Sequence, residues 1–103
     1  MNHEQYHLGK IAEEAVEVAQ RALKAQQFGL LEIQDGQSLT NLERLIGEFH
    51  DLFITLENFW HQDPERGPFP IPTDHMKQNR LEKMEKFLNL SKSLKQVEPD
   101  TFV

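Results

Sequence analysis

Apolar residues recur at helical spacing in three segments of the chain. In residues 42–60 the repeat is every three or four positions, the period of a helix with one apolar side. The segment before Gly29 is rich in Ala, Glu and Gln and contains no proline. No segment alternates apolar and polar residues with the period of two expected of a strand. The pattern predicts an all-α protein. The apolar positions of the middle segment are Leu42, Leu45, Ile46, Phe49, Leu52, Phe53, Leu56 and Trp60.

Capping and breaking residues set the ends of these predicted helices. Asn2 with Gln5, and Thr40 with Glu43, have the spacing of capping boxes that begin a helix. Gly29 supplies a stop for the first helix. Proline between Asp63 and Thr73 favours an extended connector, and Pro99 blocks extension of the third helix. We expect a single domain, residues 1–103, with helices at about 2–28, 41–62 and 74–96.

Composition narrows the classes of function. The chain has no cysteine, which excludes disulfides, thiolate metal sites and thiol nucleophiles. A formal charge of −6 disfavours binding to nucleic acid polymers. No apolar run reaches the roughly 18 residues of a membrane span, and the N-terminus lacks the pattern of a secretory signal. We therefore expect a cytoplasmic protein without a membrane partner.

Two acidic pairs lie beside the apolar faces of the first two helices. Glu14 and Glu17 are three residues apart, as are Glu48 and Asp51. At about 100° per residue each pair borders the apolar side of its helix. Residues three apart project the same way, so one ion can contact both members of a pair. The expected packing lines are Ile11, Ala15, Val18 and Ala22 on the first helix, and Leu45, Phe49 and Leu56 on the second.

Four carboxylates around one space repel each other unless a cation lies among them. Oxygen ligands without cysteine favour Mg²⁺, with Mn²⁺ as a substitute. The alternative is that these acids are ordinary solvated edges of two helices. From the residues alone both interpretations stand.

The segments Glu14-Ala15-Val16-Glu17 and Glu48-Phe49-His50-Asp51 resemble the paired ExxE and ExxD motifs of the MazG-like all-α nucleoside triphosphate pyrophosphohydrolases. The similarity covers about residues 8–60, with a longer interval between the motifs than is usual in that family. It implies a four-helix core completed by oligomerisation, and Glu14, Glu17, Glu48 and Asp51 as Mg²⁺ ligands. It also implies hydrolysis of a triphosphate to monophosphate and pyrophosphate, with Glu14 or Glu17 orienting or deprotonating the water.

Similar enzymes use basic and amide residues of a later helix to hold phosphate, a role open here to Lys77, Asn79, Arg80 and Lys83. These residues also fit a charged solvent face. Trp60 could stack on a base, although aromatic residues at helical spacing are more often core.

Two alternatives to this function remain. One is an enzyme similar to phosphoribosyl-ATP pyrophosphatase, and the other is a non-catalytic helical adaptor or assembly subunit. A homo-oligomer, at least a dimer, is expected because an apolar strip on the first helix cannot be covered by one hairpin. The strip consists of Ala12, Val16, Ala19 and Leu23. The resemblance to MazG-like enzymes implies a homodimer or homotetramer.

Overall fold

The structure, a computed structural model, describes residues 1–98. Within that range the chain is helical and contains no strand, which confirms the all-α class. Pro99, the predicted stop of the third helix, lies outside the described residues. The elements in chain order are α1 (His3–Phe28), α2 (Asn41–Trp60), the short 3₁₀ turn η1 (Pro64–Arg66) and α3 (Asp74–Ser93).

Polar side chains begin each long helix. At α1 the Asn2 side chain accepts a hydrogen bond from the Gln5 amide (2.8 Å), and the Gln5 side chain accepts one from the Asn2 amide (2.9 Å). Thr40 and Glu43 repeat this arrangement at α2, with both bonds at 3.1 Å. Each box satisfies backbone N–H groups that have no partner inside the helix. Both predicted capping boxes are therefore confirmed.

α1 ends at Phe28 as predicted, whereas α2 and α3 end slightly earlier than the sequence indicated. α2 stops at Trp60, where Arg66 donates to the carbonyl oxygens of Phe59 (2.9 Å) and Trp60 (3.2 Å) and so satisfies the end of the helix. α3 stops at Ser93, because the backbone of Lys95 adopts a φ of 59° and the chain turns. Neither ending involves a glycine, so the usual stop signal is missing.

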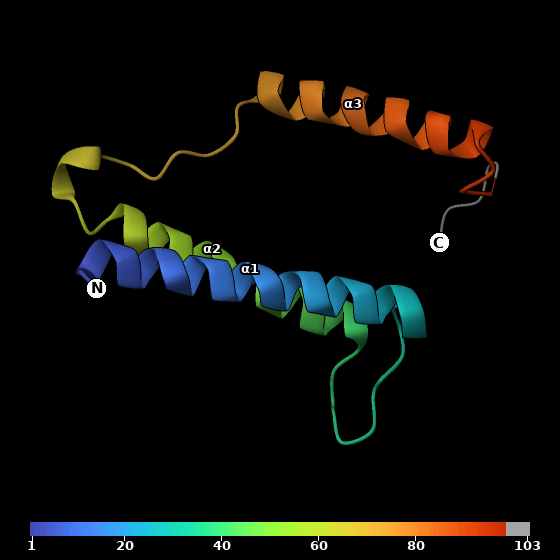
Figure 1. Cartoon of the computed structure of the whole chain (residues 1–103), viewed down its shortest axis with the longest axis horizontal. Helices are drawn as coiled ribbons and strands as arrows, with labels where there is room; N and C mark the ends of the chain where they lie inside the picture. The colour runs from blue at the N-terminus through green and yellow to red at the C-terminus, as the bar shows by residue number, and fades with distance from the viewer. Residues whose placement is uncertain (99–103) are drawn as a thin grey trace. The chain divides into compact units, whose positions relative to one another are not determined.

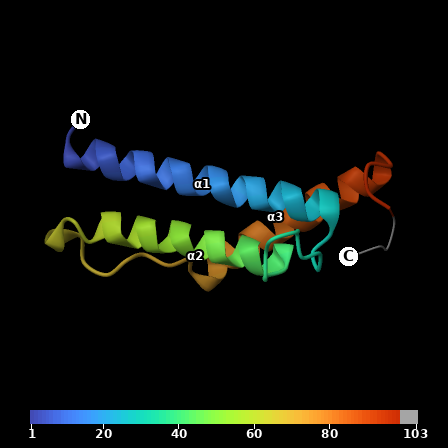
Figure 2. The same ribbon diagram turned by 90° about the horizontal axis from the view of Figure 1, so that it is seen from below.

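The described chain forms two compact units, one of residues Met1–Phe69 and a second that begins at Pro70. In the first, α1 and α2 run antiparallel and lie side by side along most of their length (Figures 1 and 2). The second is built on α3, which has no buried residue. The acidic pairs belong to the first unit.

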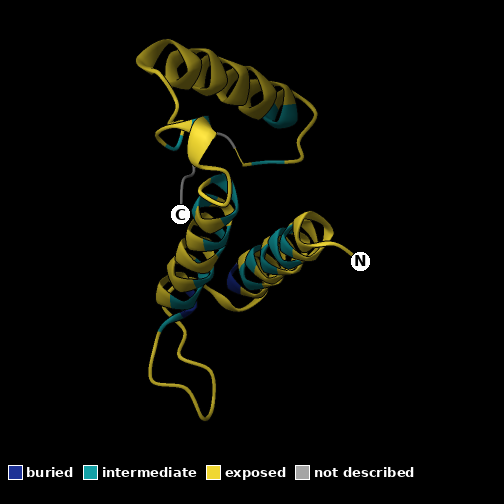
Figure 3. Cartoon of the chain, turned by 90° about the vertical axis from the view of Figure 1, so that its left-hand side faces the viewer, coloured by how far each residue is buried: buried dark blue, intermediate teal, exposed yellow. Residues whose placement is uncertain are grey.

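The line along which α1 packs on α2, here called the seam, is only partly apolar. Its buried and half-buried positions recur at alternating steps of four and three, the spacing of an antiparallel helix pair. The burial colouring shows these positions on the facing sides of the two helices (Figure 3). The seam consists of His7, Ile11, Glu14, Val18, Arg21 and Ala25 on α1, and Asn41, Leu45, Glu48, Leu52, Thr55 and Phe59 on α2.

The seam differs in rotation from the predicted packing lines. Ile11 and Val18 lie in it as expected, but Ala15 and Ala22 are exposed. On α2, Phe49 remains 50% exposed and Leu56 37%. Each helix is turned so that its acidic edge moves toward the partner and part of its apolar face turns outward. The apolar face is wider than one partner helix can cover.

An aromatic cluster closes the end of α2. The ring of Phe69 packs edge-on against Phe53 (5.4 Å between centroids) and Trp60 (6.0 Å). The Trp60 indole N–H donates to the carbonyl of Gly67 (3.1 Å). The Arg66 guanidinium lies 4.9 Å from the centre of the Phe59 ring, close enough for a cation–π interaction. These contacts fold the proline-containing segment back onto the hairpin.

Asn41 anchors the long loop between α1 and α2. It is the buried polar residue of the described chain, at 3% exposure. Its side-chain amide donates to the carbonyl of Gly29 (2.9 Å) and to the Glu32 carboxylate (3.3 Å). Its backbone N–H donates to the carbonyl of Glu32 (2.9 Å). One side chain thereby joins the end of α1, the loop and the start of α2.

Replacing Asn41 with alanine should lower the free energy of unfolding by about 1–3 kcal/mol, because the Gly29 carbonyl loses a part-buried donor. Urea denaturation followed by circular dichroism measures the change. Gln20→Ala, on the exposed side of α1, is the matched control and should have little effect. Equal stability of the Asn41 variant and the control would show that the loop is not held by this amide.

Candidate functional site

Three acids meet at the middle of the seam. Glu14 and Glu17 project from neighbouring turns of α1, and Glu48 approaches them from α2. One carboxylate oxygen of each lies within 4.8 Å of those of the other two. The structure therefore brings together residues from both predicted acidic pairs, which are thirty or more positions apart in the sequence. We call these three residues the acidic cluster.

Asp51, the fourth predicted ligand, lies at the edge of the acidic cluster. It is exposed and is not among the three residues whose oxygens converge. Its negative charge nevertheless raises the pKa values of Glu14 and Glu48. Asp51 is thus near enough to act on the cluster electrostatically.

Partial burial and mutual repulsion disfavour full ionisation of the cluster. Loss of solvent in the seam is the main cause that raises the pKa of Glu14, followed by the charges of Glu17 and Asp51. Loss of solvent also raises the pKa of Glu48, as does a hydrogen bond that its protonated form makes with Glu17. Burial and like charges both penalise the carboxylate form. Protonation or a bound cation would remove this penalty.

Three polar atoms of the seam are buried without a hydrogen-bond partner among the described residues. Two are carboxylate oxygens, Oε2 of Glu14 and Oε2 of Glu48, and the third is Nη1 of Arg21. Unpaired buried oxygens in a converging set suit a hard cation, which takes oxygen ligands. Carboxylate oxygens are the donor type that Mg²⁺ and Mn²⁺ take, and exposed acidic groups are also common in proteins without an ion.

Arg21 is a seam residue that sequence reasoning did not select. It lies one helical turn beyond Glu17 and is half-buried, yet it forms no ion pair with the acids among residues 1–98. The spacing of four from Glu17 was the available signal. Its position supplies a positive group at the border of the cluster.

Trp60, the predicted base-stacking residue, does not belong to the acidic cluster. Trp60 belongs to the aromatic cluster at the end of α2, where its indole N–H is already bonded. The polar residues proposed for phosphate lie on α3, in the second unit, and all are exposed. Within α3, Asn79 contacts the ring of His75 (3.3 Å). These α3 residues are Lys77, Asn79, Arg80 and Lys83.

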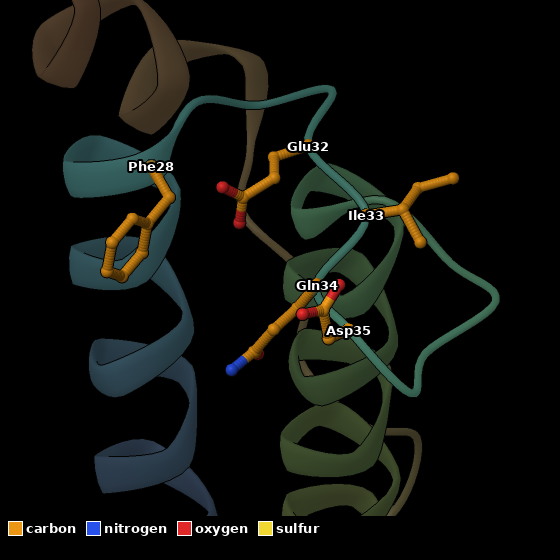
Figure 4. A pocket seen from close by; sticks show the side chains of 5 residues that line it. All are labelled: Phe28, Glu32, Ile33, Gln34 and Asp35. Carbon is orange, nitrogen blue, oxygen red and sulfur yellow. The ribbon is translucent and has the colours of Figure 1, made fainter.

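Several surface hollows lie on the hairpin, and two of them concern the acidic cluster and the loop. One, of about 450 Å³, adjoins Glu17 on α1 and is bordered by Ala12, Glu13, Val16 and Gln20. The other, of about 330 Å³, lies at the loop (Figure 4). Phe28 on its wall is eleven residues from Glu17, or roughly 16 Å along the helix. The loop hollow is therefore separate from the acidic cluster. It is lined by Phe28, Glu32, Ile33, Gln34 and Asp35.

Glu48→Gln should raise the melting temperature of the metal-free protein at neutral pH, because it removes a partly buried charge while keeping the side-chain shape. A raised pKa means that the folded state binds the proton more tightly than the unfolded state does. The stability that Glu48 contributes is therefore present at low pH and lost as pH rises above 4.5 toward the raised pKa. The advantage of the variant should grow over that window.

Thermal unfolding between pH 4 and pH 8 in the presence of a chelator tests this. Glu65→Gln serves as the control. Glu65 is exposed, and its substitution removes the same charge at a position outside the seam. An advantage for Glu48→Gln that does not increase with pH, or that Glu65→Gln shares, would contradict the proposed repulsion.

Among residues 1–98, no helix combines the length and the apolar composition needed to cross a bilayer. The functional interpretation rests on the residues of the hairpin, because no family model, curated protein or solved structure matches the chain.

Proposed function

We propose that the protein is a Mg²⁺-dependent nucleotide pyrophosphohydrolase that converts a nucleoside triphosphate into a monophosphate and pyrophosphate. The observation that carries this proposal is the convergence of Glu14, Glu17 and Glu48 within 4.8 Å across two helices. The paired ExxE and ExxD motifs, which resemble those of MazG-like enzymes, supply these residues. A deoxynucleotide is among the candidate substrates.

The acidic cluster together with Asp51 would hold the metal, with Mn²⁺ as an alternative to Mg²⁺. When bound, the ion neutralises charge on the triphosphate and polarises the α-phosphoryl group. This addresses a basic difficulty, since a chain with a formal charge of −6 repels a polyanion. Glu14 and Glu48, whose pKa values are raised in the metal-free state, would then be fully ionised.

Residues of the chain would orient and deprotonate the attacking water. Glu14 or Glu17 would accept a proton from it as its oxygen bonds to the α-phosphorus. The bond from that phosphorus to the bridging oxygen breaks, and pyrophosphate leaves. Glu17 has the more suitable access, because it is exposed and borders the 450 Å³ hollow, whereas Glu14 is half-buried.

Phosphate binding is proposed for Lys77, Asn79, Arg80 and Lys83. Their exposure leaves their polar groups available to a ligand. Trp60 is a weaker candidate for base stacking, because its ring edge and N–H are engaged. We further propose that the protein acts in the cytoplasm as a homodimer or homotetramer.

Glu17→Gln and Asp51→Asn should each reduce pyrophosphate release by on the order of 100-fold or more, while helicity remains that of the wild type. The assay measures pyrophosphate from a panel of nucleoside and deoxynucleoside triphosphates, with and without Mg²⁺. Glu65→Gln is the matched control, because Glu65 is exposed and lies outside both the acidic cluster and the hollow beside Glu17. A Glu17 variant with near wild-type turnover would refute the assignment of Glu17.

Mg²⁺ alone should raise the melting temperature, because a cation that binds the folded cluster and not the unfolded chain stabilises the fold by mass action. Differential scanning fluorimetry over a Mg²⁺ titration to millimolar concentration should show a saturating rise. The rise should be lost in Glu17→Gln and absent when NaCl matches the ionic strength. A flat titration would argue that no site is formed before nucleotide binds.

A further inference from the structure

The hairpin carries an exposed apolar face that spans both of its helices. At about 100° per residue, this face lies on one side of the seam and the acidic residues Glu13, Glu17 and Asp51 lie on the other. Because α1 and α2 are antiparallel, a rotation of the same sign from the seam leads to the same side of the hairpin on both helices. The face consists of Leu8, Ala12, Ala15, Ala19 and Ala22 on α1, and Leu42, Ile46, Phe49, Phe53 and Leu56 on α2.

The two halves of this face differ in size of side chain. α1 contributes mainly alanines, which leave a shallow depression, and α2 contributes large side chains. Phe49 is 50% exposed, Ile46 45% and Phe53 39%. The α1 side of the face is therefore recessed, because its side chains are small, and the α2 side projects, because its side chains are large.

Each small side chain of α1 lies at the same position along the hairpin axis as a large side chain of α2. Glu48 lies beside both Glu14 and Glu17, and the rings of His7 and Phe59 are 6.5 Å apart. Ala15, between the two glutamates of α1, is therefore level with Phe49. Steps of three or four residues in opposite directions then give the other level pairs: Leu8 with Leu56, Ala12 with Phe53, Ala19 with Ile46, and Ala22 with Leu42.

We propose that a second copy of the chain covers this face, related by a two-fold axis parallel to the helices. Such an axis lays α1 of one copy over α2 of its partner at the same level, so each alanine receives a large side chain from the other copy. An axis across the helices would instead set alanines on alanines and leave gaps between the helices. The inference rests on the homo-oligomer of the proposed function and specifies which helices meet.

The size of the face suits a stable dimer. A helix of twenty residues is about 30 Å long, and two helices spaced at 8–10 Å are roughly 20 Å wide. The outline of the face is therefore about 600 Å², and its accessible area is larger because the side chains project. Standard interfaces bury about 800 Å² on each partner.

Exchanging the small and large side chains of one pair, Ala15 and Phe49, tests the proposed two-fold arrangement. The experiment uses the full chain without nucleotide. Ala15→Phe places a large side chain where the partner's Phe49 fits, and should weaken the dimer at least about tenfold. Adding Phe49→Ala restores the fit and should recover most of the affinity. Adding Phe53→Ala instead removes the same ring at another level and should not. Light scattering over a dilution series measures association, and circular dichroism checks helicity.

A wild-type monomer at micromolar concentration would overturn the proposal, as would rescue by Phe53→Ala equal to that by Phe49→Ala. Cysteine cross-linking covers the case in which Ala15→Phe does not fold, since the chain has no cysteine of its own. Ala15→Cys and Phe49→Cys chains, mixed and oxidised, should form the mixed disulfide. Exclusive linkage of Ala15→Cys chains to one another would overturn the axis. None of these readouts depends on pyrophosphate release, so failure here is distinct from failure of the proposed activity.

Discussion

Two carboxylates, Glu14 and Glu48, lie in the line along which α1 packs on α2, where loss of solvent and the neighbouring charge of Glu17 disfavour their ionised forms. Both are half-buried, and each has an oxygen with no hydrogen-bond partner among the described residues. Raised pKa values are one response, because protonation removes the charge. A bound cation is the other, and it removes the repulsion at a pH where the carboxylates stay ionised.

A polar seam leaves little apolar burial inside the hairpin. Ala25 is the buried apolar residue of the described chain, and α2 keeps large side chains in solvent. Burial of apolar area is the main source of folding stability, at about 25 cal/mol per Å². Local devices such as the capping boxes and the Asn41 amide fix the ends of the helices and the loop, but each contributes only on the order of 1 kcal/mol. The hairpin therefore depends on further burial, which a second copy would supply.

The sequence predicted the helices better than it predicted their rotation. Capping residues such as Thr40 and Glu43 act within one turn, so local pattern was sufficient to place the helix starts. The packing line was wrong at Ala15 and Ala22, because periodicity shows how wide an apolar face is but not which part meets which partner. Arg66 was missed for another reason. Its role depends on the chain folding back at η1, which proline alone does not specify.

Part of the site was accessible from sequence because its spacing is local. Glu14 and Glu17 lie on the same side of α1 because residues three apart are neighbours on a helix surface. That Glu48 would meet them depends on the antiparallel register of the two helices, which spacing within one helix does not specify, and the same is true of the absence of Asp51 from the three converging oxygens. The residues on α3 belong to a separate compact unit, so their contribution to phosphate binding is still a prediction.

The acidic cluster and the apolar face occupy opposite sides of the same seam, which couples them physically. Relieving the repulsion among Glu14, Glu17 and Glu48 would favour the rotation and register of α1 relative to α2 on which the proposed alignment of Ala15 with Phe49 depends. Covering the apolar face in turn holds the two helices in the register that brings Glu48 to Glu14 and Glu17. By linkage, a cation that tightens the seam must favour association to the same extent that association favours the cation. Under the proposed function, the metal site and the oligomer would therefore assemble together.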